Sequence, residues 1–216
     1  MTKRSYGQYC AVARGLDLIG DRWTLLIARD LLLGPKRYKD LLDGLPGIGT
    51  NLLAARLREM AAAGLVERAV LPPPAGSSVY QLTGAGRDLE PVITAIGRWG
   101  ARFLGSPRDG EVLLPRAYFV AIRPAFRADR AAGLAASYEF RVGGLVFEVR
   151  VHDGRCTTRE GAAAGPDAVF TMDVGTLHEL LLAGLPAAAA LASGRVRVTG
   201  DPAHLDRFTG LFALHR

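Results

Sequence analysis

Residues 47–82 hold the pattern that most restricts the fold of this chain, because a helical stripe is followed directly by two short extended runs. On a helix over 50–63, Leu53, Leu57 and Met60 fall on one face. A glycine ends that helix, and "LVERAV" and "VYQLT" then have the composition of two strands joined by the loop "LPPPAGSS". With further helices before it, this order predicts a winged helix-turn-helix module.

Shorter helices are expected before this pattern. The segment "AVARGLDLIG" predicts one helix ended by Gly20, and Asp21 is expected to cap the next helix, "RWTLLIARDLLLG". The segment "KRYKDLLDGL" predicts a third helix with one apolar face. Thr50 is expected to cap the helix over 50–63.

The face of the 50–63 helix opposite the stripe carries mostly small residues, with one amide and one guanidinium. It holds Asn51, Ala54, Ala55, Arg58 and Ala62. Small side chains let a helix approach a surface closely, and Asn and Arg can pair with adenine and guanine in the major groove. The alternative is that alanine is simply a good helix former. The pattern alone leaves both interpretations open.

A longer apolar helix is expected after the hairpin. Thr83 is expected to open a helix over 84–104 with an apolar face. That face holds Leu89, Val92, Ile93, Ile96, Trp99 and Phe103. We interpret it as a dimerisation helix, and the alternative is packing within the same chain.

Positive charge is concentrated in the first half of the chain. Residues 1–104 hold 14 Lys and Arg against 9 Asp and Glu, whereas residues 105–216 hold 13 against 12. Such an excess favours an anionic partner, nucleic acid first and a membrane surface second. No apolar run reaches the roughly 18 residues of a membrane span, and no apolar signal core follows the basic start. We therefore expect a cytoplasmic protein without a membrane partner.

The first half resembles the HxlR-type winged-helix transcriptional regulators. The resemblance rests on "YCAVARGLDLIGDRW", "RYKDL", "GIGTNLLAARLREM" and "YQLTGAGRDLEPVITAIGRWG". It implies a homodimer that binds double-stranded operator DNA and represses or activates nearby genes. By position, it implies bases faced by Asn51, Ala55 and Arg58, and phosphates held by Lys36, Arg37, Lys39, Thr50, Arg56 and Arg68. The chain departs from the family at Ala11, where proline is common, and in a wing tip without a basic residue.

The resemblance gives Cys10 two interpretations. In some members of the family the equivalent cysteine senses oxidants or electrophiles, and such a role requires a stabilised thiolate. The alternative, which we favour here, is a small buried hydrophobe at the dimer interface. Cys156 is the only other cysteine, and no structural disulfide is expected.

The second half is expected to form a separate domain. We predict a DNA-binding and dimerisation domain over 1–104, a linker over 105–116 and an α+β domain over 117–216. Seven of the eight phenylalanines follow residue 105. Alternation through Tyr138, Phe140 and Val142, then Val146, Glu148 and Arg150, predicts a hairpin around Gly143-Gly144. "AYFVAIRPAF" is ambiguous between helix and strand.

This half resembles the sterol-carrier-protein-type domains. The resemblance rests on "PDAVFTMDVGTLHELLLAGL" and "LASGRVRVTGDPAHLDRFTGLF". It implies an apolar tunnel that holds a lipophilic effector. The lining would be Phe140, Phe147, Phe170, Met172, Leu177, Leu181, Leu185, Phe208 and Phe212. The alternative is that the phenylalanines only fill a core.

Enzyme chemistry is not expected. The sequence shows no nucleophile–base pair, phosphate-binding glycine loop or paired catalytic carboxylates, and the four histidines are too scattered for a metal site. We therefore predict a cofactor-free, ligand-responsive transcriptional regulator. Two alternatives stay open, namely a thiol sensor acting through Cys10 with a purely structural second domain, and a lipid carrier.

Overall fold

The computed structural model describes residues 5–73, 76–105 and 107–212, and the chain divides into two compact units. Unit 1 is Met1–Phe103 and unit 2 is Leu104–Arg216. The basic start at residues 1–4, the wing residues 74–75, Ser106 of the expected linker and His215 lie outside the described residues. The fold is mixed α and β, as the sequence predicts.

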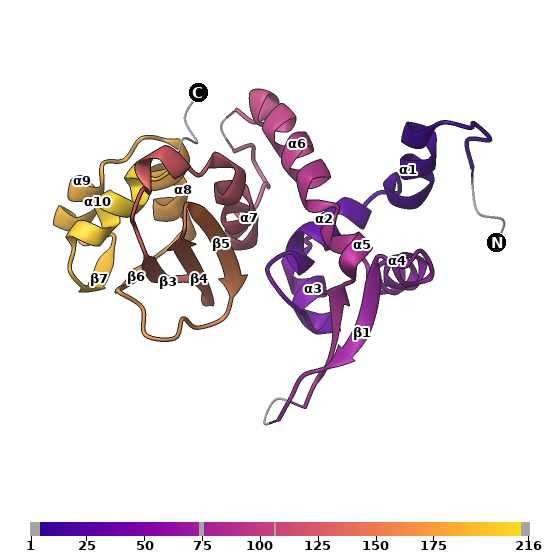
Figure 1. Ribbon diagram of the computed structural model, residues 1–216, viewed down its shortest axis with the longest axis horizontal. Helices are drawn as coiled ribbons and strands as arrows, with labels where there is room; N and C mark the ends of the chain where they lie inside the picture. The colour runs from indigo at the N-terminus through magenta and orange to yellow at the C-terminus, as the bar shows by residue number, and fades with distance from the viewer. Residues whose placement is uncertain (1–4, 74–75, 106, 213–216) are drawn as a thin grey trace. The chain divides into compact units, whose positions relative to one another are not determined.

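Unit 1 is a set of helices with a two-stranded wing (Figure 1). Its elements are α1 (Ala11–Ile19), α2 (Thr24–Leu31), α3 (Tyr38–Gly44), α4 (Thr50–Ala62), β1 (Val66–Val70), β2 (Ser78–Leu82), α5 (Gly84–Arg87), α6 (Glu90–Gly100) and the 3-10 turn η1 (Ala101–Phe103). The strands β1 and β2 pair antiparallel. This is the order predicted for a winged helix-turn-helix module.

The predicted caps of α2 and α4 are wrong. The residue before α2 is Trp23, whose φ of 82° is the left-handed conformation, and Asp21 lies in the turn before it. The carboxylate of Asp21 instead pairs with the guanidinium of Arg56. The cap position of α4 is Gly49, whose carbonyl accepts the first helical hydrogen bond, so Thr50 is already the first helical residue.

The single helix expected over 84–104 is interrupted. Thr83 does cap its first part, because its hydroxyl accepts a hydrogen bond from the Gly86 amide at 3.1 Å. However, α5 ends at Arg87 and α6 begins at Glu90. Pro91 accounts for the break, since a proline has no N–H to donate to the carbonyl four residues earlier.

The core of unit 1 lies between α2, α3, α4 and the wing. The stripe Leu53, Leu57 and Met60 is buried in it, as predicted. After the wing, Leu89 just before α6 and Ile93 on α6 pack against the same core. The buried stripe fixes which face of α4 points outward.

Unit 2 has a five-stranded sheet with helices packed on it (Figure 1). Its elements are α7 (Pro115–Ala125), the 3-10 turn η2 (Ala128–Arg130), β3 (Ala136–Val142), β4 (Leu145–His152), β5 (Arg155–Glu160), β6 (Ala168–Met172), α8 (Val174–Leu182), α9 (Ala187–Ala192), β7 (Arg197–Gly200) and α10 (Ala203–Gly210). The strand order is β5-β4-β3-β6-β7, and only β3 and β6 run parallel.

The hairpin between β3 and β4 turns at Gly143-Gly144, as predicted. Both glycines have positive φ, which a two-residue hairpin turn of this kind requires. The buried face of β4 is formed by Phe147, Val149 and Val151, so the alternation through Val146, Glu148 and Arg150 belongs to the opposite face. That opposite face carries the four arginines of β3, β4 and β5, which are Arg141, Arg150, Arg155 and Arg159.

The ambiguous segment before the sheet is a helix, α7, and it begins at Pro115, inside the expected linker. Pro124 is compatible with this helix because it stands in the last turn of α7. Two contacts fasten α7 to the edge strand β5. The guanidinium of Arg116 pairs with Glu160 at 2.7 Å, and that of Arg123 donates to the Thr158 hydroxyl at 2.6 Å. An edge strand covered in this way is protected from pairing with other chains.

Candidate functional site

The outward face of α4 presents a small, sparsely charged surface. Asn51 and Arg58 are exposed and Ala55 is half-buried on this face. Within the described residues, neither Asn51 nor the guanidinium of Arg58 has a recorded hydrogen bond or ion pair. Two groups able to recognise base edges are therefore free on one helix face.

Arg56 has different surroundings, although it stands on the same helix. Its guanidinium pairs with Asp21 at 2.6 Å and also with Glu59, and only 17% of its side chain is exposed. A phosphate would have to displace these two carboxylates. No local pattern predicts the contact between Arg56 and Asp21, because the two residues are 35 positions apart in the chain.

The three basic residues at the start of α3 are not equivalent. Lys36 lies in an isolated bridge with Tyr80, before the helix rather than on it, and is only 4% exposed. Its ammonium donates to the Gly34 carbonyl at 3.3 Å. Lys36 therefore lies before α3, although the third helix is expected to begin at this residue. Arg37 and Lys39 are both exposed.

A tyrosine that the sequence pattern did not single out for function joins α3 to α4. The hydroxyl of Tyr38 donates to the Thr50 carbonyl at 2.6 Å. This bond holds the start of α4 beside the start of α3. Arg37, Lys39 and Thr50, which flank the two bonded residues in sequence or include one of them, are exposed.

On the wing, Arg68 is exposed but tethered. Its guanidinium lies over the Tyr80 ring at 5.3 Å and donates to the Tyr80 hydroxyl at 2.9 Å. The wing loop beyond it includes residues 74–75, which are outside the described part of the chain. Among the described residues of β1 and β2, Arg68 is the one with a basic side chain.

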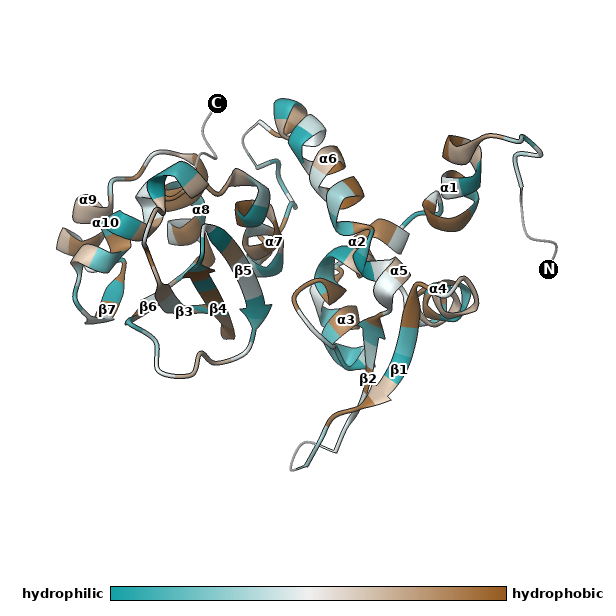
Figure 2. Cartoon of the chain, in the orientation of Figure 1, coloured by the Kyte–Doolittle hydropathy of each residue, from teal (hydrophilic) through white to brown (hydrophobic). Residues whose placement is uncertain are grey.

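Two helices of unit 1 leave apolar side chains uncovered within a single chain. Figure 2 shows hydrophobic residues recurring along α1 and α6. No residue of α6 is buried, and its exposed large side chains include Val92, Ile96 and Trp99, the last of them 62% exposed. On α1, Val12 and Leu16 are exposed as well. Faces of this kind are typical of protein–protein contacts.

The two cysteines have different surroundings. Cys10 is exposed at the cap position of α1, where the backbone amides of Ala13 and Val12 lower the pKa of its thiol. Burial raises the pKa of Cys156 to about 12. In the single chain Cys10 is exposed, so its expected burial at a dimer interface stays a prediction, and the lowered pKa of its thiol favours the thiolate more at Cys10 than at Cys156.

The side chains expected to line an apolar tunnel form a packed core in unit 2. All nine are buried except Leu185, which is half-buried. Phe140 contacts Phe170 and Phe208 at centroid distances of 4.9 and 4.7 Å. Phe119 of α7 stacks on Phe147 at 4.1 Å, a contact the sequence did not indicate. The phenylalanines of the predicted lining thus lie together in the core of unit 2.

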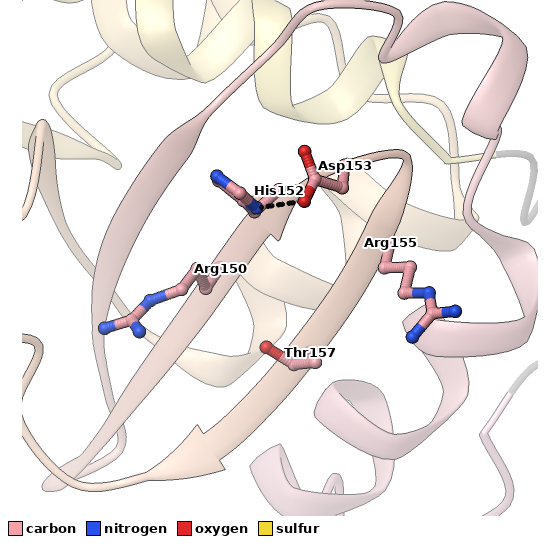
Figure 3. A pocket seen from close by; sticks show the side chains of 5 residues that line it. All are labelled: Arg150, His152, Asp153, Arg155 and Thr157. Carbon is pink, nitrogen blue, oxygen red and sulfur yellow. Dashed lines mark ion pairs between the residues drawn. The ribbon is translucent and has the colours of Figure 1, made fainter.

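A pocket of about 550 Å³ lies elsewhere in unit 2, at the β4–β5 hairpin (Figure 3). It is lined by Arg150, His152, Asp153, Arg155 and Thr157. Figure 3 shows the guanidinium groups of Arg150 and Arg155 directed away from each other, and His152 paired with Asp153 at 2.9 Å. These polar groups do not converge on one point, and they are unlike the apolar lining predicted for an effector.

Further features bear on other classes of function. Among the described residues, no helix has the length and apolar character to cross a membrane. Within the same residues, no group of three or more His, Cys, Asp or Glu is placed to hold a metal ion.

Helices packed before a wing, with a free amide and guanidinium on α4, define a DNA-binding regulator of the winged helix-turn-helix class. Residues 18–107 match the model of the HxlR-like helix-turn-helix family, and residues 122–213 match that of the SCP-2 sterol transfer family. The chain belongs to the HxlR-like family of transcriptional regulators, and its second unit is an SCP-2-type domain.

Known relatives align with the first unit. The uncharacterised regulator sll1512 of Synechocystis sp. is 36% identical over 45% of this chain and 73% of that protein. The uncharacterised regulator Rv3095 of Mycobacterium tuberculosis is 38% identical over 48% of this chain, and the match spans 65% of that relative's length. A solved structure of reduced YodB from Bacillus subtilis is 33% identical, covers 47% of this chain and all of YodB, and gives a TM-score of 0.40.

Proposed function

We propose that this chain is a homodimeric regulator in which the two α4 helices read operator DNA and unit 2 binds a lipophilic effector. The observation that carries the DNA-binding part is the outward face of α4. Its buried stripe directs Asn51 and Arg58 to solvent without partners among the described residues. A protein that binds DNA works where the DNA lies, so we place it in the cytoplasm.

The proposed contacts fall into two groups. Asn51, Ala55 and Arg58 meet base edges, where an amide suits adenine and a guanidinium suits guanine. Arg37, Lys39, Thr50 and Arg68 meet phosphates, which fix the position of the protein without reading sequence. Lys36 is left out of this set because it is buried, and Arg56 joins it only when it leaves Asp21.

The homodimer is proposed from the uncovered apolar faces of α1 and α6. A two-fold dimer places two α4 helices about 34 Å apart, one turn of DNA, so the operator is expected to be an inverted repeat. An apolar contact between two copies would cover Val92, Ile96 and Trp99, which the single chain leaves exposed.

The first test is fluorescence anisotropy of the full chain with the DNA just upstream of its own gene and with a scrambled duplex. We expect tight binding to the first duplex, weaker binding to the second, and loss of affinity at higher salt for both. Equal, salt-sensitive binding to duplexes drawn from across the neighbouring genes would contradict sequence recognition.

The effector function is proposed from the match to the SCP-2 family and from the apolar core of unit 2. An effector changes operator affinity only if it binds the DNA-competent and incompetent dimers with different affinity. A coupling of about 1–3 kcal/mol corresponds to a 5- to 150-fold change. By the same linkage, operator DNA must change effector affinity by the same factor, which titration calorimetry with and without the operator measures.

Regulation through Cys10 is a second candidate, favoured by its exposure and by the two amides that lower the pKa of its thiol. In this case a mild oxidant or a quinone would change operator affinity, and a thiol reductant would restore it. The Cys10→Ser variant would not respond. If that variant responds like the parent, the redox function is excluded and the effector function stands alone.

Thiol labelling separates the two cysteines before that test. Near pH 7 we expect a thiol reagent to modify Cys10 rapidly and Cys156 very slowly, because a pKa of about 12 leaves almost no thiolate at Cys156. Mass spectrometry of the labelled peptides gives both rates. Equal rates at the two positions would show that burial does not protect Cys156.

A further inference from the structure

The sheet of unit 2 is covered by helices on one face, and its other face is largely open. Phe119 of α7 and Phe208 of α10 pack on the covered face. On the other face, the connection 161–163 makes backbone hydrogen bonds with the side chains of Glu139 and Arg159. The outward residues of four strands include five exposed arginines, which are Arg141, Arg150, Arg155, Arg159 and Arg197. We call the surface that carries them the outer sheet face.

The carboxylates of the outer sheet face lie beneath its guanidinium groups. Glu139 and Glu148 stand directly opposite each other on β3 and β4, and their side chains are only 6% and 8% exposed. Glu139 pairs with Arg141 at 2.8 Å, and Glu148 pairs with Arg150 and Arg159 at 2.6 and 2.8 Å. The three arginine side chains are nevertheless 53–59% exposed. The outermost charges of this face are therefore positive.

Positive charge is concentrated on this face of unit 2. The outer sheet face holds five arginines and two glutamates, whereas the rest of residues 105–216 holds eight arginines and ten acidic residues. Two of those acidic residues, Asp153 and Asp167, border the face at one end. Within the described part of the chain, the side chains of Arg155 and Arg197 have no recorded hydrogen bond or ion pair. The face thus offers both fixed and unoccupied guanidinium groups to an anionic partner.

The guanidinium groups are spread over the face rather than gathered at one point. Arg150 and Arg155 are directed away from each other (Figure 3). Thr157 lies opposite Arg150 in the strand register, and Thr171 lies opposite Arg197, so hydroxyl groups stand among the arginines. A single small anion could not contact such separated donors together. A series of phosphates along a backbone suits them, because arginine and threonine side chains are common partners of DNA phosphates.

The other side chains of the face favour duplex DNA over other anionic partners. Among the described residues of the five strands, no Phe, Tyr or Trp points outward, so the face lacks the rings on which single-stranded bases stack. Its outward valines, Val146 and Val169, are only half-exposed. The face therefore offers no large apolar side chain to anchor it in a lipid surface.

We propose that the outer sheet face of unit 2 binds the sugar–phosphate backbone of double-stranded DNA beside the operator. The inference rests on the proposed DNA-binding function of unit 1. Once α4 holds the operator, the neighbouring phosphates are at high local concentration for unit 2 of the same chain. Contacts to phosphates carry no sequence information, so this face adds affinity and salt dependence without changing which sequence is chosen.

The test uses a double variant of the full chain, Arg155→Gln with Arg197→Gln. These two arginines are chosen because their loss leaves no buried carboxylate without a partner. The control, Arg130→Gln with Arg207→Gln, removes the same charge from exposed positions on the helical side of unit 2. Anisotropy is measured over a series of salt concentrations with a duplex of about 60 base pairs from upstream of the gene, roughly six turns of DNA, and with its scrambled counterpart. Thermal unfolding shows that each variant is folded.

We expect the slope of log affinity against log salt concentration to be shallower by about two in Arg155→Gln/Arg197→Gln, because two phosphate contacts are lost. The control should keep the slope of the parent. The ratio of dissociation constants for the two duplexes should stay within twofold of the parent in both variants. Hydroxyl-radical footprinting should show backbone protection outside the two half-sites in the parent and in the control, but not in Arg155→Gln/Arg197→Gln.

The failure of this inference can be distinguished from failure of the proposed DNA reading. Equal slopes for Arg155→Gln/Arg197→Gln and its control would overturn the inference and leave sequence reading by α4 intact. Equal affinity of the parent for the two duplexes would instead overturn sequence reading, and the slopes would still decide whether the outer sheet face binds phosphates. A parent chain that binds neither duplex overturns both.

Discussion

Arg56 and Arg58 stand two positions apart on α4 and have different surroundings. Arg58 projects from the exposed face without a recorded partner in the described chain, whereas Arg56 is held by Asp21 and Glu59. The contact between Arg56 and Asp21 joins α4 to the turn before α2. At the scale of single residues, the proposed base-reading role therefore falls to Arg58, whereas Arg56 holds α4 in position.

Removing the charge of Asp21 should strengthen DNA binding. The Asp21→Asn variant keeps the size of the side chain but frees Arg56 to pair with a phosphate. Because Asp21 is mostly exposed, the competing pair is worth only about 0.2–1 kcal/mol, so we expect a gain of at most about fivefold. Anisotropy at a series of salt concentrations gives the slope of log affinity against log salt concentration. We expect this slope to be steeper by about one in Asp21→Asn, because one more phosphate is neutralised.

The control is Asp43→Asn, which removes the same charge from another exposed position of unit 1. It should change affinity less and leave the salt slope unaltered. If Asp21→Asn binds no tighter than this control, then Arg56 does not exchange a carboxylate for a phosphate.

At the scale of elements, Thr83 and Thr50 show how similar sequence signals lead to different structures. Both threonines stand where a helix is expected to begin. The Thr83 hydroxyl accepts from Gly86 and donates to the Gly64 carbonyl at 2.6 Å, so it ties α5 to the end of α4. Thr50 lies inside the first turn of α4, where Gly49 takes the cap position.

Replacing each threonine by alanine should separate the two positions. We expect Thr83→Ala to lower the free energy of unfolding of unit 1 by about 1 kcal/mol or more, and Thr50→Ala to change it by less than about 0.5 kcal/mol. Urea unfolding followed by tryptophan fluorescence reports on unit 1 alone, because Trp23 and Trp99 are the only tryptophans. Equal losses would show that the Thr83 bonds contribute no more than an exposed hydroxyl does.

Elements with a strong local pattern were predicted well from the sequence. The stripe of α4 and the Gly143-Gly144 hairpin follow from periodicity and turn chemistry, which act over a few residues. Pro91 also indicates the interruption, but the regular spacing of apolar residues on either side led to the prediction of one continuous helix. The missing N–H of this proline therefore determined the local structure more than the apolar spacing did.

What the sequence could not give depends on contacts between distant residues. The burial of Lys36 follows from its bridge to Tyr80, and the occupation of Arg56 follows from Asp21. The same holds for the stacking of Phe119 on Phe147 and for the ion pair between Glu148 and Arg159. Composition and spacing do not indicate such pairings. Candidate site residues that are chosen by residue type alone therefore include both side chains without partners and side chains that already have them.

At the scale of the whole molecule, the two units divide the work of a regulator. Unit 1 carries the proposed DNA-reading face and the uncovered apolar helices, and unit 2 carries the apolar core of the SCP-2 type. The chain passes from unit 1 to unit 2 after η1, between Phe103 and Leu104. In the proposed mechanism, binding in unit 2 alters the dimer contact made by α6 and so the separation of the two α4 helices.

A charge placed on the apolar face of α6 should therefore break the dimer. We expect Ile96→Asp to sediment as a monomer in analytical ultracentrifugation and to lose most of its operator affinity, because one copy reads only half of an inverted repeat. Arg98→Asp changes charge on the opposite side of the same helix and should remain dimeric. A dimeric Ile96→Asp variant would remove α6 from the interface.

The central claim is that the outward face of α4 reads sequence. The most direct measurement is the ratio of dissociation constants for a scrambled and an operator duplex, determined for the parent chain and for Arg58→Ala at one salt concentration. The account predicts a large ratio for the parent and a fall of about 5- to 150-fold in Arg58→Ala, as expected when a base contact worth 1–3 kcal/mol is lost. An unchanged ratio in Arg58→Ala would contradict it, because discrimination would then lie outside this face of the helix.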